Sequence, residues 1–255
     1  MSHDPIVMWQ PIATDSELVP PMLVLHPEVP LSKYKFSYDS ANGQAVATTP
    51  SMTLTSMSLN GDFYQEELAA LQSWYANPIV MEKYADGKTR THEQTEARYK
   101  LLADRWTAGF PYSGLMARNA DNEIVAMFNF GYAVDDENKV RKGVTEFAAV
   151  VNPENWNQGL ASEAMILMLF VVKYLSDNGY QIADLPLNTV TTAARTDNWA
   201  DRVLQKSALT FRGNKELYGA TRNVYESSVS ELTSVIDNTE RSQQENGNFF
   251  PSPKL

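Results

Sequence analysis

The 255-residue chain contains no cysteine. It therefore has no disulfide bonds, no thiolate ligands for zinc or iron–sulfur clusters, and no cysteine nucleophile. Histidine is scarce as well, because His3, His26 and His92 lie far apart and none belongs to an H-E-x-x-H pair. The sequence offers no metal site of the usual histidine or cysteine kind, and we expect no metal cofactor.

An excess of positive charge and a long apolar run are also missing. Lysine and arginine total 21 against 31 aspartates and glutamates, so the net charge is −10. Since duplex nucleic acid binds to basic surfaces, we expect no nucleic-acid partner. The longest apolar run covers only residues 164–172, whereas a membrane-spanning helix needs roughly 20 apolar residues. The first residues do not resemble a signal peptide, so we expect a cytoplasmic protein that does not bind membranes.

Two familiar catalytic or nucleotide-binding motifs are absent too. Residues 86–89 read D-G-K-T, like the end of a phosphate-binding P-loop, but the glycine required five positions before Gly87 is Glu82. The G-x-S-x-G nucleophile elbow does not occur. The sequence therefore favours neither a P-loop nucleotidase nor a serine hydrolase of that type.

The pattern that is present alternates helical and strand periodicities along most of the chain, between a proline-rich start and a polar end. The predicted helices cover residues 62–75, 91–106, 160–177 and 198–207, and the predicted strands cover 113–118, 123–133, 143–151, 187–194, 209–212 and 222–229. Six prolines interrupt the first 30 residues, so we expect residues 1–50 to form an irregular N-terminal arm. The polar composition near the other end predicts a flexible C-terminal extension over residues 231–255.

The segment that carries chemistry joins the predicted strand 143–151 to the helix that begins near Leu160. It reads W-N-Q-G-L-A-S-E-A from Trp156. Small residues at Gly159 and Ala161 let the backbone approach a ligand closely, and the free N–H groups of a first helical turn bind anions such as phosphate. The spacing alone leaves a second interpretation open, in which Gly159 and Ala161 only allow the helix to pack closely on the sheet.

This segment resembles motif A of the Gcn5-related N-acetyltransferases (GNAT), which reads [QR]-x-x-G-x-[GA]. Trp156 stands where that motif has glutamine or arginine. The longer string W-x-x-G-L-A-S-E-A is similar to the RimJ/RimL-type branch, which acetylates protein N-termini and small amines. Residues 198–211 resemble that branch's N-x-x-S-x-x-[LV]-x-K-x-G-F stretch, although Asp201 replaces its serine and Ala208 its glycine.

The resemblance implies one acetyltransferase-like domain over residues 51–230 with an α+β fold of the GNAT type: a mixed, mostly antiparallel central sheet with helices on both faces. Two strands splay apart in such folds, and acetyl-CoA lies as co-substrate in the V-shaped slot between them. The strand end would then pair with the pantetheine arm, the following loop would hold the pyrophosphate, and an asparagine would lie beside the pantetheine or the thioester. The implied cofactor-binding residues are Ala149, Val150, Val151, Trp156, Asn157, Gln158, Gly159, Leu160, Ala161, Ser162 and Asn198.

The implied activity is N-acetyl transfer to a primary amine, either a protein N-terminus or a small molecule, by direct attack through a tetrahedral intermediate. Glu146 is our first candidate for the base that deprotonates the amine; alternatively, it only orients the substrate or pairs with an arginine. Many family members place a tyrosine seven residues after the asparagine, but this chain has Gln205 there, and the sequence does not place the hydroxyls of Tyr218 and Tyr225.

Two other functions stay open from the sequence: a non-catalytic acyl-CoA-binding module, and an unrelated α+β interaction domain. The acidic net charge favours cationic amines as acceptors. The arm over residues 1–50 either covers the acceptor cleft or contributes a contact in a homodimer.

Overall fold

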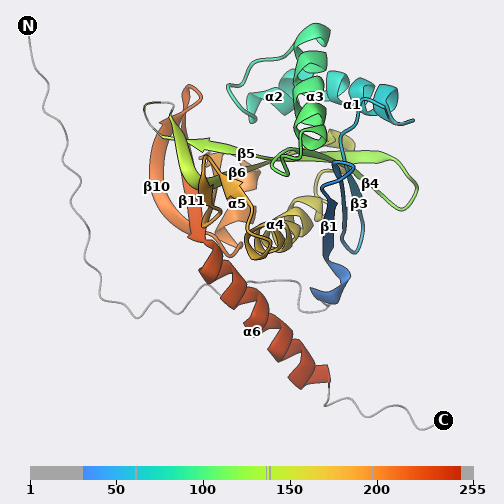
Figure 1. Ribbon diagram of the computed structural model, residues 1–255. Coiled ribbons are helices and arrows are strands. Elements are labelled where there is room, and N and C mark those ends of the chain that lie inside the picture. The colour runs from blue at the N-terminus through green and yellow to red at the C-terminus, as the bar shows by residue number, and fades with distance from the viewer. Residues whose placement is uncertain (1–30, 61, 136, 138, 197, 248–255) are drawn as a thin grey trace, which may run out of the picture.

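A nine-stranded sheet runs through the computed structural model, which describes residues 31–247 except 61, 136, 138 and 197 (Figure 1). Its strand order is β1-β2-β3-β4-β5-β6-β9-β11-β10, and every neighbouring pair is antiparallel except β6 and β9. The strands are β1 (Lys35–Asp39), β2 (Gln44–Thr48), β3 (Thr53–Ser56), β4 (Gly114–Arg118), β5 (Ile124–Val134), β6 (Val140–Val151), β9 (Thr189–Arg195), β10 (Thr210–Leu217) and β11 (Ala220–Ser228), with β7 (Gln181–Ile182) and β8 (Leu185–Pro186) forming a separate pair.

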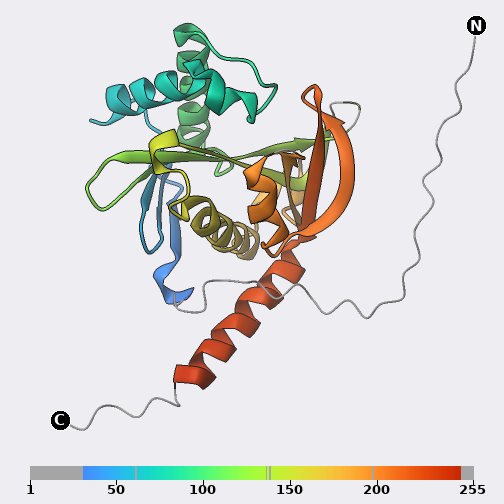
Figure 2. The ribbon, with the colours of Figure 1, turned by 180° about the vertical axis from the view of Figure 1, so that it is seen from behind.

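Helices cover both faces of this sheet. They are α1 (Tyr64–Ala76), α2 (Pro78–Glu82), α3 (His92–Thr107), α4 (Leu160–Asp177), α5 (Trp199–Gln205) and α6 (Val229–Gly247), with short 3₁₀ turns η1 (Leu31–Lys33) and η2 (Pro153–Asn155). Helices α1 to α3 lie on one face and α4 on the other, as the opposite views of Figure 1 and Figure 2 show. The predicted α+β class, with a mixed and mostly antiparallel sheet between helices, is confirmed. Within the described residues, no helix is both long enough and apolar enough to cross a membrane.

Helix α4 is the central helix of the core. Its middle is apolar nearly all round, and it contacts β1, β6, α5 and α6, so it buries more than one face. The helix ends where Gly179 takes a φ of +73°, a left-handed conformation that favours glycine. Its N-terminus directly follows the loop after β6.

Helix α3 carries residues of the candidate site on one side and core residues on the other. A capping box begins this helix: the Thr91 hydroxyl accepts a hydrogen bond from the Gln94 backbone N–H at 3.3 Å, and the Gln94 side chain accepts one from the Thr91 N–H at 3.0 Å. Tyr99 and Trp106 are buried on the core side. These contacts hold the helix, and with it Arg98, in one position over the sheet.

The prediction of an irregular arm over residues 1–50 is wrong for the part that the structure describes. Strands β1 and β2 form a hairpin that joins β3 and extends the sheet. Tyr38 is buried against Trp106 and Tyr180, with ring centroids 5.5 and 5.8 Å apart. The prolines that suggested irregularity all lie among residues 1–30, outside the described residues, so they do not interrupt either strand.

The prediction of a flexible extension over residues 231–255 is wrong as far as residue 247, since α6 covers residues 229–247. Val229, Leu232 and Ile236 are buried on one side of this helix, which packs on α4. The spacing i, i+3, i+7 places these three apolar side chains in one stripe. The polar composition of α6 reflects that most of the helix surface is exposed to solvent. An exposed surface does not make a segment unstructured when one apolar stripe is buried.

Candidate active site

Strands β6 and β9 diverge in the middle of the sheet. They pair in parallel at only three positions, Val144 with Thr189, Thr145 with Val190, and Glu146 with Thr191. Beyond Glu146, β6 stays paired with β5 up to Val151, and β9 stays paired with β11 up to Arg195. Beyond this point β6 and β9 each keep a strand partner on the side away from the other. Their edges that face each other have no strand pairing. Such edges can accept an added strand.

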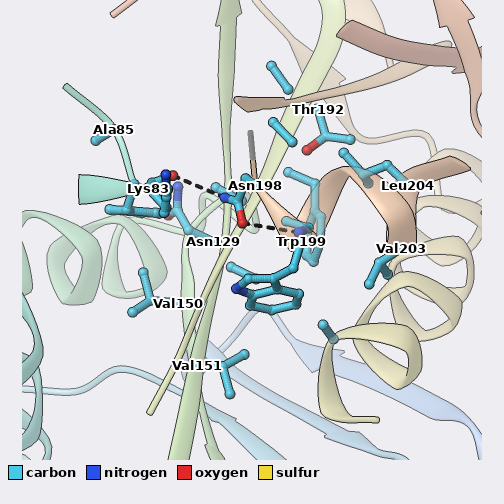
Figure 3. A pocket seen from close by; sticks show the side chains of 18 of the residues that line it. Lys83, Ala85, Asn129, Val150, Val151, Thr192, Asn198, Trp199, Val203 and Leu204 are labelled. Carbon is cyan, nitrogen blue, oxygen red and sulfur yellow. Dashed lines mark hydrogen bonds between the residues drawn. The ribbon is translucent and has the colours of Figure 1, made fainter. Parts of the chain in front are cut away.

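A cavity of about 310 Å³ occupies this slot. Its walls come from α2 and α3 on one side of the sheet and from α4 and α5 on the other, with β5, β6, β9, the turn between β10 and β11, and the base of β11 between them (Figure 1 and Figure 2). Figure 3 labels part of this lining, including Val150 and Asn198. Residues opposite each other in an antiparallel pair share a face, and the pairs Gly131–Glu146 and Asn129–Ala148 therefore lie on the same face. Among the described residues that line the cavity, Glu146 is the only acidic one.

The loop after β6 brings Trp156 and the start of α4 to one end of the cavity. The Trp156 indole N–H donates a hydrogen bond to the Val151 carbonyl at 2.9 Å, which ties the loop to the end of the strand. Its ring lies 6.2 Å from that of Trp199, which is 42% exposed. Gly159 caps α4 with a φ of +83°, and nothing lies within 4 Å of the place where a Cβ would be. The backbone at this glycine therefore faces open space.

Backbone N–H groups at the start of α4 are left without acceptors. No residue in the described part of the chain accepts a hydrogen bond from the N–H groups of residues 157–161. The Ser162 N–H, in contrast, donates to the Gly159 carbonyl at 2.9 Å. Since the N-terminal end of a helix carries a partial positive charge, these unpaired donors form a suitable site for an anion.

The predicted cofactor-binding residues divide into two groups. Those that line the cavity are Ala149, Val150, Val151, Trp156, Ala161 and Asn198, and Glu146 lines it too. Those outside its wall are Asn157, Gln158, Gly159, Leu160 and Ser162. Leu160 is buried in the core, so only its backbone could face a ligand. The second group lies in the loop and first turn where the free N–H groups are found.

Asn198 lines the cavity at the start of α5 and links this helix to the end of α2. Its side-chain oxygen accepts a hydrogen bond from the Ala200 N–H at 3.1 Å and so caps α5, while its amide N–H donates to the Lys83 carbonyl at 3.3 Å (Figure 3). Asparagine suits this position because it is a preferred helix N-cap. The residue thus connects α5 to α2 across the slot.

The Glu146 carboxylate lies where the two strands separate. The Tyr218 hydroxyl donates to it, with oxygen–oxygen distances of 3.0 and 3.2 Å. Tyr218 and Gly219 form the turn between β10 and β11 with φ of +54° and +75°, which aims the tyrosine back over the site. Burial raises the pKa of Glu146, and the Tyr218 hydroxyl, Arg222 and Arg98 partly oppose this rise. A carboxylate with a raised pKa is better suited to act as a base near neutral pH.

The sequence did not identify several residues that the structure brings to the cavity. Tyr218 is the tyrosine whose hydroxyl reaches the site, whereas the Tyr225 hydroxyl donates to Asp201 at 2.7 Å. Arg98 and Asn129 also line the cavity, although no motif surrounds them. The Tyr218-Gly219 pair is typical of a hairpin turn, so the sequence could indicate the turn. No neighbouring residue indicates that the Tyr218 hydroxyl contacts Glu146, which lies 72 residues earlier in the chain.

No group of three histidine, aspartate or glutamate side chains within the described residues is arranged to hold a metal ion. Glu163, which belongs to the W-x-x-G-L-A-S-E-A string, instead accepts hydrogen bonds from the hydroxyls of Thr49 at 2.5 Å and Ser51 at 2.8 Å. It therefore fastens the start of α4 to the loop between β2 and β3.

Comparisons with known proteins agree with this geometry. Residues 62–209 match the family model of the acetyltransferase (GNAT) domain. A comparison with curated protein sequences finds no match. Among solved structures, an acetyltransferase of the GNAT family from Bacillus anthracis is similar over 70% of this chain and 95% of its own, with 16% identity and a TM-score of 0.51.

Two further structures are similar and hold coenzyme A or acetyl-CoA. AAC(6')-Ib in complex with paromomycin and acetyl-CoA shares 17% identity over 72% of this chain and 96% of its own, with a TM-score of 0.54. RimL, a ribosomal-protein α-N-acetyltransferase in complex with coenzyme A, shares 15% identity over 72% of this chain and 97% of its own, with a TM-score of 0.51. At these identities the likeness concerns the fold.

Proposed function

Because the chain belongs to the GNAT acetyltransferase domain family, we propose that it transfers the acetyl group of acetyl-CoA to a primary amine bound in the slot between β6 and β9. The observation that carries this proposal is the divergence of the two strands after Glu146, next to a helix start with unpaired N–H groups. These two features can hold the two chemically different parts of acetyl-CoA, an amide-bearing arm and a pyrophosphate.

The residues of the slot fit acetyl-CoA as follows. The edge of β6 at Ala149, Val150 and Val151 would pair with the pantetheine amides, since that edge lacks a strand partner. The N–H groups of residues 157–161 would bind the pyrophosphate, and the open space beside Gly159 leaves room for it. Ser162 contributes less than expected, because its N–H already has an acceptor. Asn198 would lie beside the pantetheine arm or the thioester.

The acceptor amine must lose a proton before it attacks the thioester carbonyl. A lysine amine with a pKa of about 10.4 requires about 4.6 kcal/mol for this at pH 7, whereas an α-amino group with a pKa of about 7.7–8.0 requires about 1.4 kcal/mol. We propose that Glu146 takes this proton, directly or through water, and that its pKa, raised by burial, suits it for the task. The attack forms a tetrahedral intermediate that collapses with loss of the CoA thiolate.

Tyr218 is the candidate that protonates the leaving thiolate. Its hydroxyl points into the cavity and contacts Glu146, and burial raises the pKa of Tyr218, so the hydroxyl keeps its proton at neutral pH and can donate it. The position where many family members have this tyrosine is Gln205, whose side-chain amide instead donates to Asp201 at 2.7 Å. A tyrosine from a hairpin turn would thus replace one from a helix.

We further propose that the chain is of the RimJ/RimL type and that residues 51–230 form its catalytic unit. The string from Trp156 to Ala164 supports the first point, and Glu163 has a structural reason to be part of it, because it anchors the helix start. Strands β1 and β2 then extend the sheet at the edge far from the slot. The cytoplasmic location and the homodimer stay predictions.

The decisive experiment measures release of the CoA thiol from acetyl-CoA with a panel of polyamines, aminoglycosides, amino acids and N-terminal peptides. Amine-dependent release supports the proposal. Tight binding of acetyl-CoA without release on any amine would favour the acyl-CoA-binding module, and the absence of CoA binding would exclude both functions.

A pair of glycine variants tests the CoA site itself. Gly159→Glu should lower CoA affinity about tenfold or more, because it places a carboxylate beside the bound pyrophosphate. Gly179→Glu is the matched control: Gly179 lies at the other end of α4, with φ of +73° and nothing within 4 Å of its Cβ position. Both variants strain the backbone by roughly 1–2 kcal/mol, but the control should bind CoA normally. Equal affinity of the two variants, measured by calorimetry, would contradict the site.

A further inference from the structure

The part of the cavity beside Glu146 and below α2 and α3 is rich in positive charge. Arg98 of α3 lines it, and no residue in the described part of the chain forms a hydrogen bond or ion pair with its guanidinium. Lys83 also lines it, but its ammonium lies 3.3 Å from the Glu82 carboxylate. A guanidinium on a cavity wall that forms no hydrogen bond or ion pair with the described residues can bind a carboxylate with two parallel hydrogen bonds.

Arg222 adds a second guanidinium to the same region. Its side chain is buried, and it donates to two backbone carbonyls, those of Leu217 at 3.0 Å and Ala85. Neither of these acceptors carries a full charge. Both Arg98 and Arg222 act electrostatically on Glu146, so the two cations lie near the carboxylate where the amine is expected. One acidic side chain thus faces two arginines.

Asn129 supplies an independent sign that a ligand belongs here. The residue is only 8% exposed and lines the cavity (Figure 3), yet its Oδ1 atom is buried and finds no hydrogen-bond partner among the described residues. Its strand neighbour on β6 is Ala148, two residues from Glu146 on the same face. A buried carbonyl oxygen without a hydrogen-bond partner costs folding free energy, so its presence is explained if a bound molecule donates a hydrogen bond to it.

We propose that the acceptor is an amine that also carries a carboxylate, which Arg98 binds while Asn129 hydrogen-bonds the acceptor beside Glu146. The inference rests on the proposed acetyl transfer and names the acceptor class for it. Two sources share this chemistry: a free amino acid, and a peptide whose N-terminal residue is aspartate or glutamate. The expectation of a cationic acceptor, which came from the net charge of −10, is thereby reversed for the cavity itself.

The test compares Arg98→Gln with the intact enzyme on matched pairs of acceptors. One pair is a peptide with N-terminal glutamate against the same peptide with N-terminal glutamine, and the other is leucine against leucinamide; the two pairs distinguish the two sources. The measured quantity is the ratio of kcat/KM for the acid to that for the neutral amide. Since the amine pKa of each acceptor is the same for both enzymes, its effect cancels when the ratios are compared.

Arg98→Gln should lower this ratio about 10- to 100-fold for at least one pair, the usual range for a hydrogen bond to a charged group. Arg98→Lys, which keeps the charge, should restore part of it. Lys100→Gln is the matched control, because it removes one positive charge from an exposed position of α3 outside the cavity wall. Thermal unfolding of each variant checks that it folds.

The proposal is overturned if Arg98→Gln leaves both ratios unchanged, or if Lys100→Gln lowers them equally. A failure of the carboxylate site can be told apart from a failure of the proposed acetyl transfer. If CoA release depends on an amine but shows no preference for acidic acceptors, the acetyl transfer stands and only the carboxylate site is refuted. If no amine is acetylated, calorimetric binding of N-acetyl-leucine against N-acetyl-leucinamide, in the presence of CoA, gives the same comparison without catalysis. Equal binding of the two by the intact protein would then refute the carboxylate site.

Discussion

Replacement of Asn129 by leucine should make the protein more stable and less active. The side chain is buried on β5 with its Oδ1 unpaired, and leucine has a similar branched shape without polar atoms. The substitution therefore removes an uncompensated polar group without opening a large void. If the Asn129 amide binds the acceptor, the same substitution removes that contact and lowers the activity.

The magnitude of the stability change follows from the burial of the amide. An unsatisfied buried polar group costs roughly 1–3 kcal/mol, and part of the Asn129 side chain lines a cavity where the penalty is smaller. We expect the free energy of unfolding to rise by about 1–2 kcal/mol. For a chain of this length each kcal/mol corresponds to about 2–4 °C, so the midpoint of thermal unfolding should rise by several degrees. The loss of one ligand hydrogen bond should lower kcat/KM about tenfold or more.

The assay combines calorimetric unfolding with CoA release, and Asn119→Leu serves as control. The Asn119 side-chain oxygen accepts hydrogen bonds from the N–H groups of Asp121 at 3.1 Å and Glu123 at 2.9 Å in an exposed turn. Its loss should destabilise the protein without a direct effect on the site. A lower unfolding temperature for Asn129→Leu would refute the view that the Asn129 Oδ1 is unpaired in the folded protein. Higher stability with unchanged kcat/KM would refute the role of Asn129 in binding the acceptor.

Two substitutions, one at the proposed base Glu146 and one at Tyr218, which contacts it, test the chemistry further. Glu146→Gln should lower kcat by roughly 10²–10⁴-fold and abolish the rise of kcat/KM with pH that accompanies deprotonation of Glu146; a surviving pH-dependent rise would assign the base elsewhere. The pKa of Glu146 is higher in the folded protein than in the unfolded chain, so the intact protein loses free energy of unfolding as the pH rises and Glu146 is deprotonated. Glu146→Gln lacks this proton and should lose less stability over the same pH range. Tyr218→Phe removes a hydrogen bond that lowers the pKa of Glu146, so the rise in kcat/KM should move to higher pH while kcat falls; an unmoved pH profile measured in parallel with the intact enzyme would contradict this contact.

Local sequence signals predicted the parts of the site that consecutive residues build. The turn from Trp156 to Ala161 presents its N–H groups because of its own backbone conformation, which depends on Gly159 and its φ of +83°. The capping box of α3 is likewise made by Thr91 and Gln94, three positions apart. Such features depend on neighbours in the chain, so a motif can indicate them.

Composition was a poorer guide at the two ends of the described chain. Prolines among the first 30 residues suggested an irregular arm, but β1 and β2 follow them and join the sheet. The polar residues of α6 suggested flexibility, although a stripe including Leu232 and Ile236 packs on α4. In both cases a few apolar residues at the right spacing decided the outcome, because burial of one face is enough to hold an element.

The sequence by itself predicted the fold class and Glu146 as candidate base, because its motifs resemble those of a known family, and it predicted exposed N–H groups at the start of α4 from the short pattern around Gly159. Only the tertiary structure decided which side chains surround Glu146. Tyr218 reaches it across 72 residues, and Arg98 and Asn129 come from a helix and a strand with no motif. Strand pairing and helix packing bring these residues together, so the positive charge of the cavity is a property of the folded chain that a net charge of −10 conceals.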